Sequence, residues 1–370
     1  MAGTNGKGST CRFSHRLLSH AGLRAGLFTS PHMVCVRERF VLGEEAISET
    51  EFVDLLERVV PVSEEIGGTY FETLTAMAAV WYRERGAEAV VLETGLGGRL
   101  DSTTAFPAEV CAVAQVGLDH ELLLGDTVDK IWREKIAILR PGKPLVTGQS
   151  DPALLAELRR LAEERGGEAV VLDRSRRLRI PGLPDGEVQE DNLLLAVRAS
   201  ERFLGRAIAR EEIESALHGM RWPGRFEHVP GLPEVVLDVG HNPDAARRLA
   251  EQVGDSRPVL LFGAMADKNW RQVLSHLVPV CRAAHFAPLE LARAERPETM
   301  ARFRPEGVAH ASFDQAWEAA LADAERADAP VLVAGSFHMV GQAARRLWAG
   351  HRYRFWPDGI VPDPEIPGMG

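Results

Sequence analysis

Short apolar runs alternate along the chain with longer stretches of helical periodicity. Residues 89–93 (AVVLE) are apolar up to the last position, which is typical of a strand buried on both faces. The same reasoning predicts other strands at 24–29, 110–116, 144–147 and 169–172, a small hairpin at 39–42 and 46–47, and helices at 9–20, 51–60, 69–85, 127–139, 152–165, 190–203 and 210–217. Strands and helices that alternate in this way predict a parallel α/β sheet.

A second series of strands predicts a second domain. Its strands are expected at 235–238, 259–262, 283–286 and 331–334, with helices between them. Residues 231–233 (GLP) resemble a linker, and the basic, proline-containing residues 174–184 resemble a surface connection. A chain of 370 residues is long enough for two separate cores. We therefore predict domains at 1–228 and 233–370.

Polar residues follow the predicted strands at five places. Ligands of open α/β sheets bind beyond the carboxyl ends of the strands, so this distribution predicts a site along that edge. The residues are Ser30, Pro31 and His32, then Glu93, then Asp119 and His120, then Asp238, His241 and Asn242, and finally Gly335 and Ser336.

The first ten residues, MAGTNGKGST, resemble a phosphate-binding loop that precedes a helix. Glycines allow backbone N–H groups to turn towards phosphate oxygens, Lys7 adds a positive charge, and Ser9 or Thr10 offers a hydroxyl to Mg²⁺. The helix amino terminus adds to the attraction for an anion. The alternative is a disordered tail, because chain ends often fray and only Met1 and Ala2 precede the glycines.

Three other side chains have both a chemical and a structural interpretation. Glu93 is either a buried metal ligand or a carboxylate that leaves the sheet at the strand end. His120 is equally either a ligand or a structural histidine, and Mg²⁺ prefers oxygen ligands. Spacing alone favours Lys135 as a lysine that extends to solvent or forms an ion pair.

Composition excludes several classes of protein. A net charge of -10 argues against nucleic acid as the main partner, and no apolar run is long enough to cross a membrane. Four widely spaced cysteines without a C-x-x-C pair indicate reduced thiols in a cytoplasmic protein. Apolar residues (45%) and charged residues (26%) are in the range of ordinary globular proteins.

Taken together, the motifs resemble those of folylpolyglutamate synthase/dihydrofolate synthase, a family of the ATP-dependent Mur ligase superfamily. They occur in family order at AGTNGKGST (2–10), GLFTSPHMV (26–34), RERF (37–40), TYFETLTA (69–76), LETGLGGRLD (92–101), GLDHELLLGDT (117–127), EKIAI (134–138), WPGRFE (222–227), LDVGHNP (237–243), DK (267–268) and GSFHMVG (335–341). The resemblance implies an α/β fold with a parallel-sheet, P-loop ATPase-like Mur ligase domain, followed by a smaller Rossmann-like α/β domain.

The resemblance also implies which residues bind ATP and two Mg²⁺ ions. Thr4, Asn5, Gly6, Lys7, Gly8 and Ser9 would hold the phosphates. Asn192 would contact adenine, and Arg225 and Asp238 would also contact ATP. The metal ligands would be Ser9, Ser30, Glu93 and His120. Lys135 would be carbamylated, which converts its cation into an anion able to approach Mg²⁺.

The substrates implied by the resemblance are L-glutamate and a folate-type carboxylate. Thr29, Pro31, His32, Phe71 and Glu72 would lie at the pterin, and His241 and Ser336 at glutamate. ATP would phosphorylate the carboxylate to an acyl phosphate, which the amino group of glutamate then attacks. Lys7, His120, Lys135, Asp238 and His241 would form the catalytic set. A monomer is usual for the family.

The chain also departs from the family pattern. The family normally has a helix and a first strand before the phosphate loop, so we expect a misplaced start or a truncated chain, a loop without its anchor, and weak or no ATP hydrolysis. The family sequence DGAHN is DVGHN at 238–242, Thr104 stands where Asn is usual, and Asn269 stands where Asp is common.

Two alternative functions remain from the sequence. One is a Mur ligase that acts on a cell-wall nucleotide precursor, against which the SPH, TYFE and EKIAI segments argue. The other is a nucleotide-binding protein that has lost catalysis. The sequence leaves open whether the chain adds the first glutamate to dihydropteroate, extends reduced folates, or does both.

Overall fold

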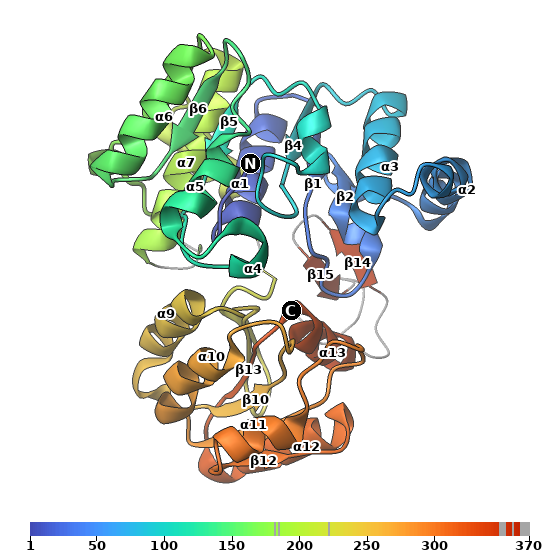
Figure 1. Ribbon diagram of the computed structural model, residues 1–370. Coiled ribbons are helices and arrows are strands. Elements are labelled where there is room, and N and C mark those ends of the chain that lie inside the picture. The colour runs from blue at the N-terminus through green and yellow to red at the C-terminus, as the bar shows by residue number, and fades with distance from the viewer. Residues whose placement is uncertain (181–182, 184–185, 221–222, 348–352, 357–358, 363–370) are drawn as a thin grey trace. The chain divides into compact units, whose positions relative to one another are not determined.

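The described part of the chain forms two compact units, which are considered separately. In this computed structural model, unit 1 comprises Met1–His32 and Arg37–Met220, and unit 2 comprises Met33–Val36 and Arg221–Gly370 (Figure 1). Residues 181–182, 184–185, 221–222, 348–352, 357–358 and 363–370 are not described. Trp222 of the WPGRFE motif, part of the connection predicted at 174–184 and the end of the second predicted domain therefore lie outside the described residues.

Unit 1 has two sheets, with strand orders β3-β2-β1-β4 and β5-β6-β7. The pairs β1–β4, β5–β6 and β6–β7 are parallel, and the predicted hairpin is present as the antiparallel pair β2–β3. The elements are α1 (Lys7–His20), β1 (Ala25–Phe28), β2 (Phe40–Leu42), β3 (Glu45–Ala46), α2 (Glu49–Glu65), α3 (Tyr70–Glu84), β4 (Ala89–Leu92), β5 (Cys111–Val113), α4 (Glu121–Leu124), α5 (Val128–Ile136), β6 (Pro144–Thr147), α6 (Pro152–Glu164), β7 (Glu168–Val171), α7 (Glu187–Leu204) and α8 (Arg210–Leu217).

Met1 and Ala2 connect these two sheets. The Met1 ammonium donates to the carbonyl of Leu92, the last residue of β4 (2.8 Å), and Thr94 N–H donates to the Met1 carbonyl (3.0 Å). On the other side, Ala2 forms a parallel bridge with Val113 of β5. The residues before the phosphate loop are therefore hydrogen-bonded on both sides, where we expected a loop without support.

The sheet β5–β7 is covered on both faces. Alternate strand residues pack against α5 and α6 through Trp132 and Leu158, and against α7 through Leu194 and Leu195. Helix α1 packs against α7 and α8 and against β1 and β4. This packing fixes the start of α1, where the phosphate loop ends.

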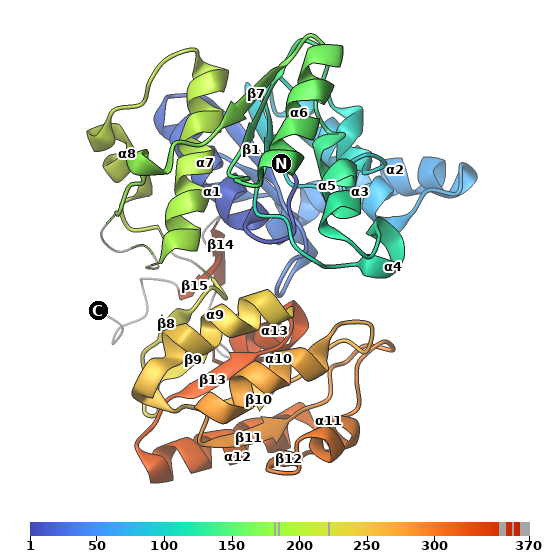
Figure 2. The same cartoon turned by 60° about the vertical axis from the view of Figure 1, so that its left-hand side comes forward.

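Unit 2 has a six-stranded sheet of order β12-β11-β10-β13-β9-β8, parallel except for β8, and a separate antiparallel pair β14–β15. One core lies between the sheet and α9, α10 and α11, and the other between the sheet and α12 and α13 (Figure 2). The elements are β8 (Glu227–Val229), β9 (Val235–Leu237), α9 (Pro243–Val253), β10 (Val259–Phe262), α10 (Trp270–Leu277), β11 (Ala283–Phe286), α11 (Pro297–Phe303), β12 (Gly307–Ala309), α12 (Phe313–Ala327), β13 (Val331–Ala334), α13 (Phe337–Leu347), β14 (Tyr353–Trp356) and β15 (Gly359–Pro362).

The α/β fold class predicted from the sequence is confirmed, with local differences. The short strands β8 and β12 were not predicted, and β8 places residue 228 inside the sheet of unit 2. Strand β4 is half-buried after Ala89, where burial on both faces was expected. No helix in the described ranges has the length and apolarity needed to cross a membrane.

Candidate active site

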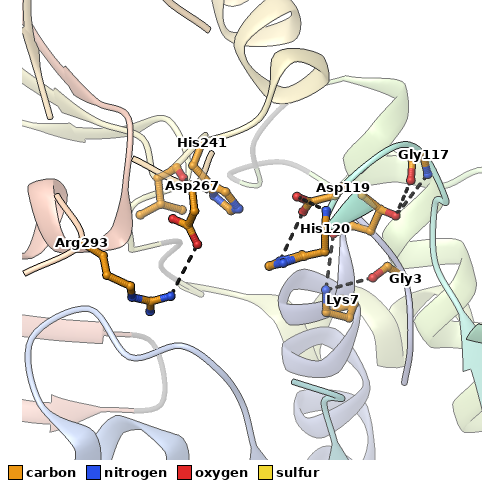
Figure 3. Close-up of polar contacts among 10 residues, drawn as sticks. Gly3, Lys7, Gly117, Asp119, His120, His241, Asp267 and Arg293 are labelled. Carbon is orange, nitrogen blue, oxygen red and sulfur yellow. Dashed lines mark hydrogen bonds and ion pairs between the residues drawn. The ribbon is translucent and has the colours of Figure 1, made fainter. Parts of the chain in front are cut away.

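The phosphate loop of unit 1 is held by its own polar groups. Lys7 Nζ donates to the carbonyl oxygens of Gly3 (2.9 Å) and Thr4 (3.4 Å), so the ammonium lies across the loop (Figure 3). Thr4 Oγ1 exchanges hydrogen bonds with the backbone of Gly117, which follows β5. The backbone N–H groups of Thr4 and Asn5 donate to the Gln115 carbonyl at 2.8 and 3.3 Å. The loop is thus attached to the carboxyl end of β5.

Gly6 is a position in the phosphate loop where a larger side chain would displace a neighbour. Its φ is +83°, and a Cβ built there would lie 2.2 Å from Asn192 Oδ1. Asn192 is buried in α7, and its Nδ2 donates to Gln189 Oε1. The predicted adenine contact Asn192 therefore lies directly against the phosphate loop.

Glu93 and Ser30 meet beside Gly8. The Glu93 side chain is 4% exposed, and its Oε2 accepts a hydrogen bond from Ser30 N–H at 3.1 Å. A Cβ built on Gly8 would lie 3.5 Å from the same oxygen. Ser9, the next residue, is also buried. Two of the four predicted metal ligands, Ser30 and Glu93, are thus in contact, and Ser9 directly follows the Gly8 that adjoins them.

His120, the fourth predicted ligand, lies on the neighbouring loop. It has φ of 52°, precedes α4 and has an exposed side chain. Its Nε2 is 3.8 Å from Asp119 Oδ2 (Figure 3). Across the described ranges, no group of three or more His, Cys, Asp or Glu side chains is arranged to hold a metal ion without other ligands.

Lys135 lies on α5 with its side chain buried. Burial lowers the pKa of its ammonium to about 7, and repulsion from Lys7 acts in the same direction. Asp119, Asp101 and Glu134 oppose this shift. Within the described residues the Lys135 amine has no hydrogen-bonding or ion-pair partner, so the interpretation as a salt-bridged lysine does not apply.

A cavity of about 400 Å³ opens beyond the carboxyl ends of β5, β6 and β7. Its lining includes Asn192, the backbone region after each strand, and the start of α7. Arg174 and Arg177 both form ion pairs with Asp191 in its wall. The volume is in the range of small-molecule sites. The wall residues Gln115 and Gln149 follow strands, so the strand-end pattern could have identified them.

The predicted pterin residues lie around β1 and α3 in unit 1. Arg39 Nε donates to His32 Nδ1 at 3.0 Å, which leaves the neutral His32 ring with its proton on Nε2. The ring of Phe71 is 5.9 Å from that of Phe28. Glu72 is exposed and caps α3 by accepting from Thr69 N–H. Thr29 N–H donates to the Arg39 carbonyl, and Pro31 is exposed.

Arg39 is a site residue that the sequence reasoning did not single out. It is 8% exposed, and burial lowers the pKa of its guanidinium. The guanidinium lies 5.7 Å from the centroid of the Tyr70 ring. The RERF motif, which contains Arg39, was the feature of the sequence that could have identified it. Its contact with His32 could not be foreseen, because it depends on the chain reversing direction between the two residues.

In unit 2, the predicted residues follow β9 and β13. Asp238 accepts hydrogen bonds from the N–H groups of Phe226 (2.9 Å) and Gly240 (2.7 Å). Burial raises the pKa of its carboxyl group, and the nearby Arg225 opposes the shift. Arg225 itself lies over the Phe337 ring at 5.4 Å.

His241 and Ser336 use their polar side-chain atoms in different hydrogen bonds. His241 Nδ1 lies 3.1 Å from the Val239 carbonyl, and a carbonyl only accepts, so Nδ1 carries the proton and Nε2 is an acceptor in the neutral ring. Ser336 is 4% exposed; its hydroxyl donates to the Gly263 carbonyl and accepts from Met339 N–H. Its hydroxyl therefore supports the start of α13, and the predicted contact of Ser336 with glutamate stays a prediction.

Comparison with known proteins identifies the family. Residues 224–337 match the model of the Mur ligase glutamate ligase domain. The dihydrofolate synthase/folylpolyglutamate synthase of Escherichia coli is 34% identical over 359 residues, which cover 92% of this chain and 84% of that protein. The chain belongs to the dihydrofolate synthase/folylpolyglutamate synthase family.

Solved structures of this family have the same fold. E. coli FolC in complex with DHPP and ADP superposes with a TM-score of 0.84 at 32% identity, covering 94% of this chain and 87% of the other. A bifunctional folylpolyglutamate synthase/dihydrofolate synthase with Mn, AMPPNP and L-glutamate bound gives a TM-score of 0.81 at 31% identity, covering 94% and 88%. The family recognised from the motifs is thus confirmed over nearly the whole chain.

Proposed function

We propose that this protein is an ATP-dependent, ADP-forming ligase that adds L-glutamate to a folate-type carboxylate. The observation that supports it most directly is the meeting of Glu93, Ser30 and Gly8 at the phosphate loop. A buried carboxylate beside a glycine-rich, lysine-containing loop suits a nucleotide with its counter-ion. The solved relatives with ADP, or with Mn and AMPPNP, support the same interpretation.

ATP would extend from the phosphate loop into the cavity at β5–β7. The loop amides and Lys7 would bind the phosphates, and Asn192 would contact the base beside Gly6. Lys7 would exchange its contacts with the Gly3 and Thr4 carbonyls for phosphate oxygens. Arg225 and Asp238 of unit 2 are the remaining proposed nucleotide contacts, and Asp238 is already held by two N–H groups.

The donor set at Glu93 fits Mg²⁺. Glu93 offers a carboxylate, and Ser9 and Ser30 offer hydroxyls, while phosphate oxygens and water complete the shell of a phosphate-bound magnesium ion. His120 is the proposed ligand of a second ion. When bound, the metal neutralises charge that develops on the transferred phosphoryl group. A site that depends on phosphate oxygens agrees with the lack of a self-sufficient metal cluster in the described ranges.

Lys135 is proposed to carry a carbamate. Only the neutral amine attacks carbon dioxide, and a pKa of about 7 makes that form abundant at neutral pH. The new N–C bond replaces an N–H bond, and the proton leaves to solvent. The product is an anion that can turn towards the metal site, and it removes the cost of a buried ammonium without a partner.

Glutamate would be activated in unit 2 by His241. Its Nε2 is an acceptor in the neutral ring, so it can take a hydrogen bond or a proton from the amino group of glutamate. The deprotonated amine would attack the acyl phosphate, forming the amide as phosphate leaves. Thr29, Pro31, His32, Phe71 and Glu72 are proposed at the pterin, with the His32 tautomer set by Arg39.

The acceptor is proposed to be dihydropteroate, a reduced folate with one or more glutamates, or both, in a monomeric cytoplasmic enzyme. ADP release by the chain should be measured with glutamate and each acceptor in turn, and with a UDP-linked muropeptide as a negative control. We expect release only when glutamate and a folate-type acceptor are both present. Lys7→Ala should lower kcat/KM for ATP by about 10²-fold or more, and Lys143→Ala is the matched control.

Two results would contradict this proposal. ADP release that requires the muropeptide would point to another Mur ligase activity. ATP binding without glutamate-dependent release would favour a nucleotide-binding protein that has lost catalysis, in line with the weak turnover expected from the sequence. That expectation stays a prediction until the chain is assayed.

A further inference from the structure

The loop after β4 leads from a proposed metal ligand to helix α5. Glu93 directly follows β4, and residues 94–101 (TGLGGRLD) continue from it. Asp101 closes the loop, because its carboxylate accepts hydrogen bonds from Leu96 N–H at 2.9 Å and from Thr103 N–H at 3.0 Å. The loop therefore has a fixed shape between its two ends.

The middle of this loop is attached to the end of α5. Arg99 N–H donates to the Glu134 carbonyl at 2.9 Å, and Arg99 Nε donates to Glu134 Oε1 at 2.9 Å. The last four carbonyl groups of a helix have no partner within that helix, so the loop supplies a donor that α5 itself lacks. Lys135 is the next residue of α5, and the attachment is therefore made directly beside it.

Gly98 approaches the backbone of this helix closely. A Cβ built on Gly98 would lie 2.7 Å from the Glu134 carbonyl oxygen and 3.1 Å from that of Lys135. The neighbouring Gly97 has a φ of +66°, which favours glycine, whereas the φ of Gly98 is outside the left-handed region. The close approach to α5, and not the backbone conformation, is therefore what requires glycine at position 98.

The Lys135 side chain lies in the same region as the phosphate loop. It is 3% exposed, and the charges of Lys7 and Asp119 both act on its pKa, which requires that they lie near its amine. The chemistry proposed for Lys135 needs this amine at a set distance from the Glu93 site, because a displacement of about 1 Å can cost about 10²-fold in rate. A closed loop that starts at Glu93 and rests on α5 can fix that distance.

We propose that Gly98 is a positioning residue that sets the distance between Lys135 and the metal site at Glu93. This inference rests on the role proposed above for Lys135. Without a side chain at position 98, the loop lies directly on the helix backbone, where Arg99 N–H holds it. An added methyl group has to move the loop or α5, because the atom that it meets is a backbone oxygen. Either movement changes the position of the Lys135 amine relative to Glu93.

Steady-state kinetics of the full chain test this role with a matched control. Gly98→Ala should lower kcat about 10-fold or more, while the KM values for ATP and glutamate change much less. The control is Gly167→Ala at the amino end of β7, since Gly167 also follows a glycine of positive φ (Gly166, +60°), and a Cβ built on it would lie 2.5 Å from the Lys143 carbonyl oxygen. It should cost similar stability and leave kcat unchanged. Equal kcat values in the two variants overturn the proposal.

A double-mutant cycle distinguishes positioning of Lys135 from a general loss of structure. If Gly98 acts through Lys135, Gly98→Ala should lower kcat in the wild-type background and have little further effect in Lys135→Ala. Equal fold-changes in the two backgrounds overturn the proposal.

A charge reversal on the same loop replaces this test if Gly98→Ala does not fold. Arg99 is exposed, and Arg99→Glu places like charges at its ion pair with Glu134. We expect kcat to fall about 3-fold and to recover in Arg99→Glu/Glu134→Arg, where the pair is restored with its charges exchanged. An unchanged kcat in the single variant, or no recovery in the double variant, contradicts the proposal.

Carbon-13 NMR with labelled bicarbonate separates this inference from the proposed function. With Mg²⁺ and AMPPNP present, wild type and Gly167→Ala should give a lysine carbamate resonance that is absent in Lys135→Ala and weakened in Gly98→Ala. A weakened resonance in Gly98→Ala supports the inference even if wild type shows no ligase turnover, which would contradict the function alone. The same resonance and kcat in wild type and Gly98→Ala overturn the inference and leave the ligase function in place. If wild type turns over without the resonance, the carbamate is contradicted and the double-mutant cycle decides the positioning role.

Discussion

Lys135 is the residue where burial and charge together decide the chemistry. An exposed lysine would stay an ammonium at neutral pH, whereas the lowered pKa of Lys135 makes a nucleophilic amine available. The structure thereby changes the interpretation that spacing alone favoured, because helical periodicity cannot tell a lysine that reaches solvent from one without a partner.

Replacing Lys135 should have a large effect on the reaction and a small one on folding. We expect Lys135→Ala to lower kcat by about 10²-fold or more, because the proposed carbamate anion beside the metal site is lost. Wild-type activity should fall as pH drops below about 7, where the amine becomes protonated. It should also fall in buffer freed of carbon dioxide and return with bicarbonate.

The control for this experiment is Lys143→Ala, since Lys143 forms an exposed ion pair with Glu109. Its activity should match that of wild type and respond to bicarbonate in the same way. A Lys135→Ala variant with wild-type turnover, or one that bicarbonate stimulates, would contradict the carbamate.

Single residues of the candidate site were predictable to different degrees. Glu93 could be predicted because a carboxylate at the end of an apolar run needs a partner, and Ser30 N–H supplies one. The Arg39–His32 contact could not, because it joins side chains whose distance depends on tertiary structure. Exposed charged residues also carry no hydrophobic signal in the sequence.

The start of α1 is the element on which the phosphate site depends. The sequence predicted a helix from residue 9, and the structure begins it at Lys7, with Gly6 as N-cap. Glycine is required because φ is positive and because Asn192 Oδ1 occupies the space beside its Cα. Lys7 therefore lies in the first turn of α1. The backbone N–H groups of a first helical turn have no partner within the helix.

Gly6→Ala and Gly22→Ala form a matched pair for testing this helix start. Gly22, just after α1, has φ of +90° with no atom within 4 Å of a Cβ built there. Both substitutions should cost about 1 kcal/mol of stability from backbone strain. Only Gly6→Ala displaces Asn192, so we expect its KM for ATP to rise about 10-fold or more while that of Gly22→Ala stays at the wild-type value.

Equal KM values for ATP in the two variants would contradict the role given to the Gly6–Asn192 contact. Unfolding in urea supplies the second measurement, because similar losses of stability would establish that strain is matched. Circular dichroism should be used to check that both variants remain folded.

Elements with strong periodicity were predictable, and short ones were not. Strands β6, β10 and β13 and helix α6 lie where the apolar pattern placed them. The strand residues alternate between two cores, and α6 has one face in a core and the other in solvent. Strand β8 (EHV) and helix α4 have too few residues for a period to be seen. Strand β8 forms by pairing with β9. Helix α4 begins at the turn made by His120.

Within the whole molecule, each unit carries its own core and its own titrating groups. His15 of α1 is buried in unit 1, and its Nε2 lies 3.2 Å from the Ala25 carbonyl, so the neutral ring donates there. Burial lowers the pKa of this imidazole to about 4. In the unfolded chain this histidine has its ordinary pKa of about 6.5. Between about pH 4 and pH 6.5 the unfolded chain therefore binds more protons than the folded chain.

We expect unit 1 to lose stability as pH falls from about 6.5 towards 4, where His15 must be protonated on unfolding. His15→Gln keeps a donor for the Ala25 carbonyl but does not titrate. The fall in the free energy of unfolding between pH 7 and pH 5 should be smaller in this variant by about 1–2 kcal/mol. Urea unfolding monitored by circular dichroism at the two pH values measures it, and identical losses would contradict the assignment.

The overall architecture could be predicted from the order of strands and helices in the sequence. The connection between the two sheets of unit 1 could not. Two residues before a glycine-rich loop are too short to be read as a strand. Their pairing with β4 and β5 exists only because the flanking strands leave a place for them.

This attachment of Met1 and Ala2 has a consequence for affinity. The root of the phosphate loop is ordered when the sheet forms, so the conformational entropy of shaping the loop is lost in folding and not when a polyanion arrives. A flexible terminal segment would instead have to be organised by each incoming nucleotide, at the expense of its binding free energy.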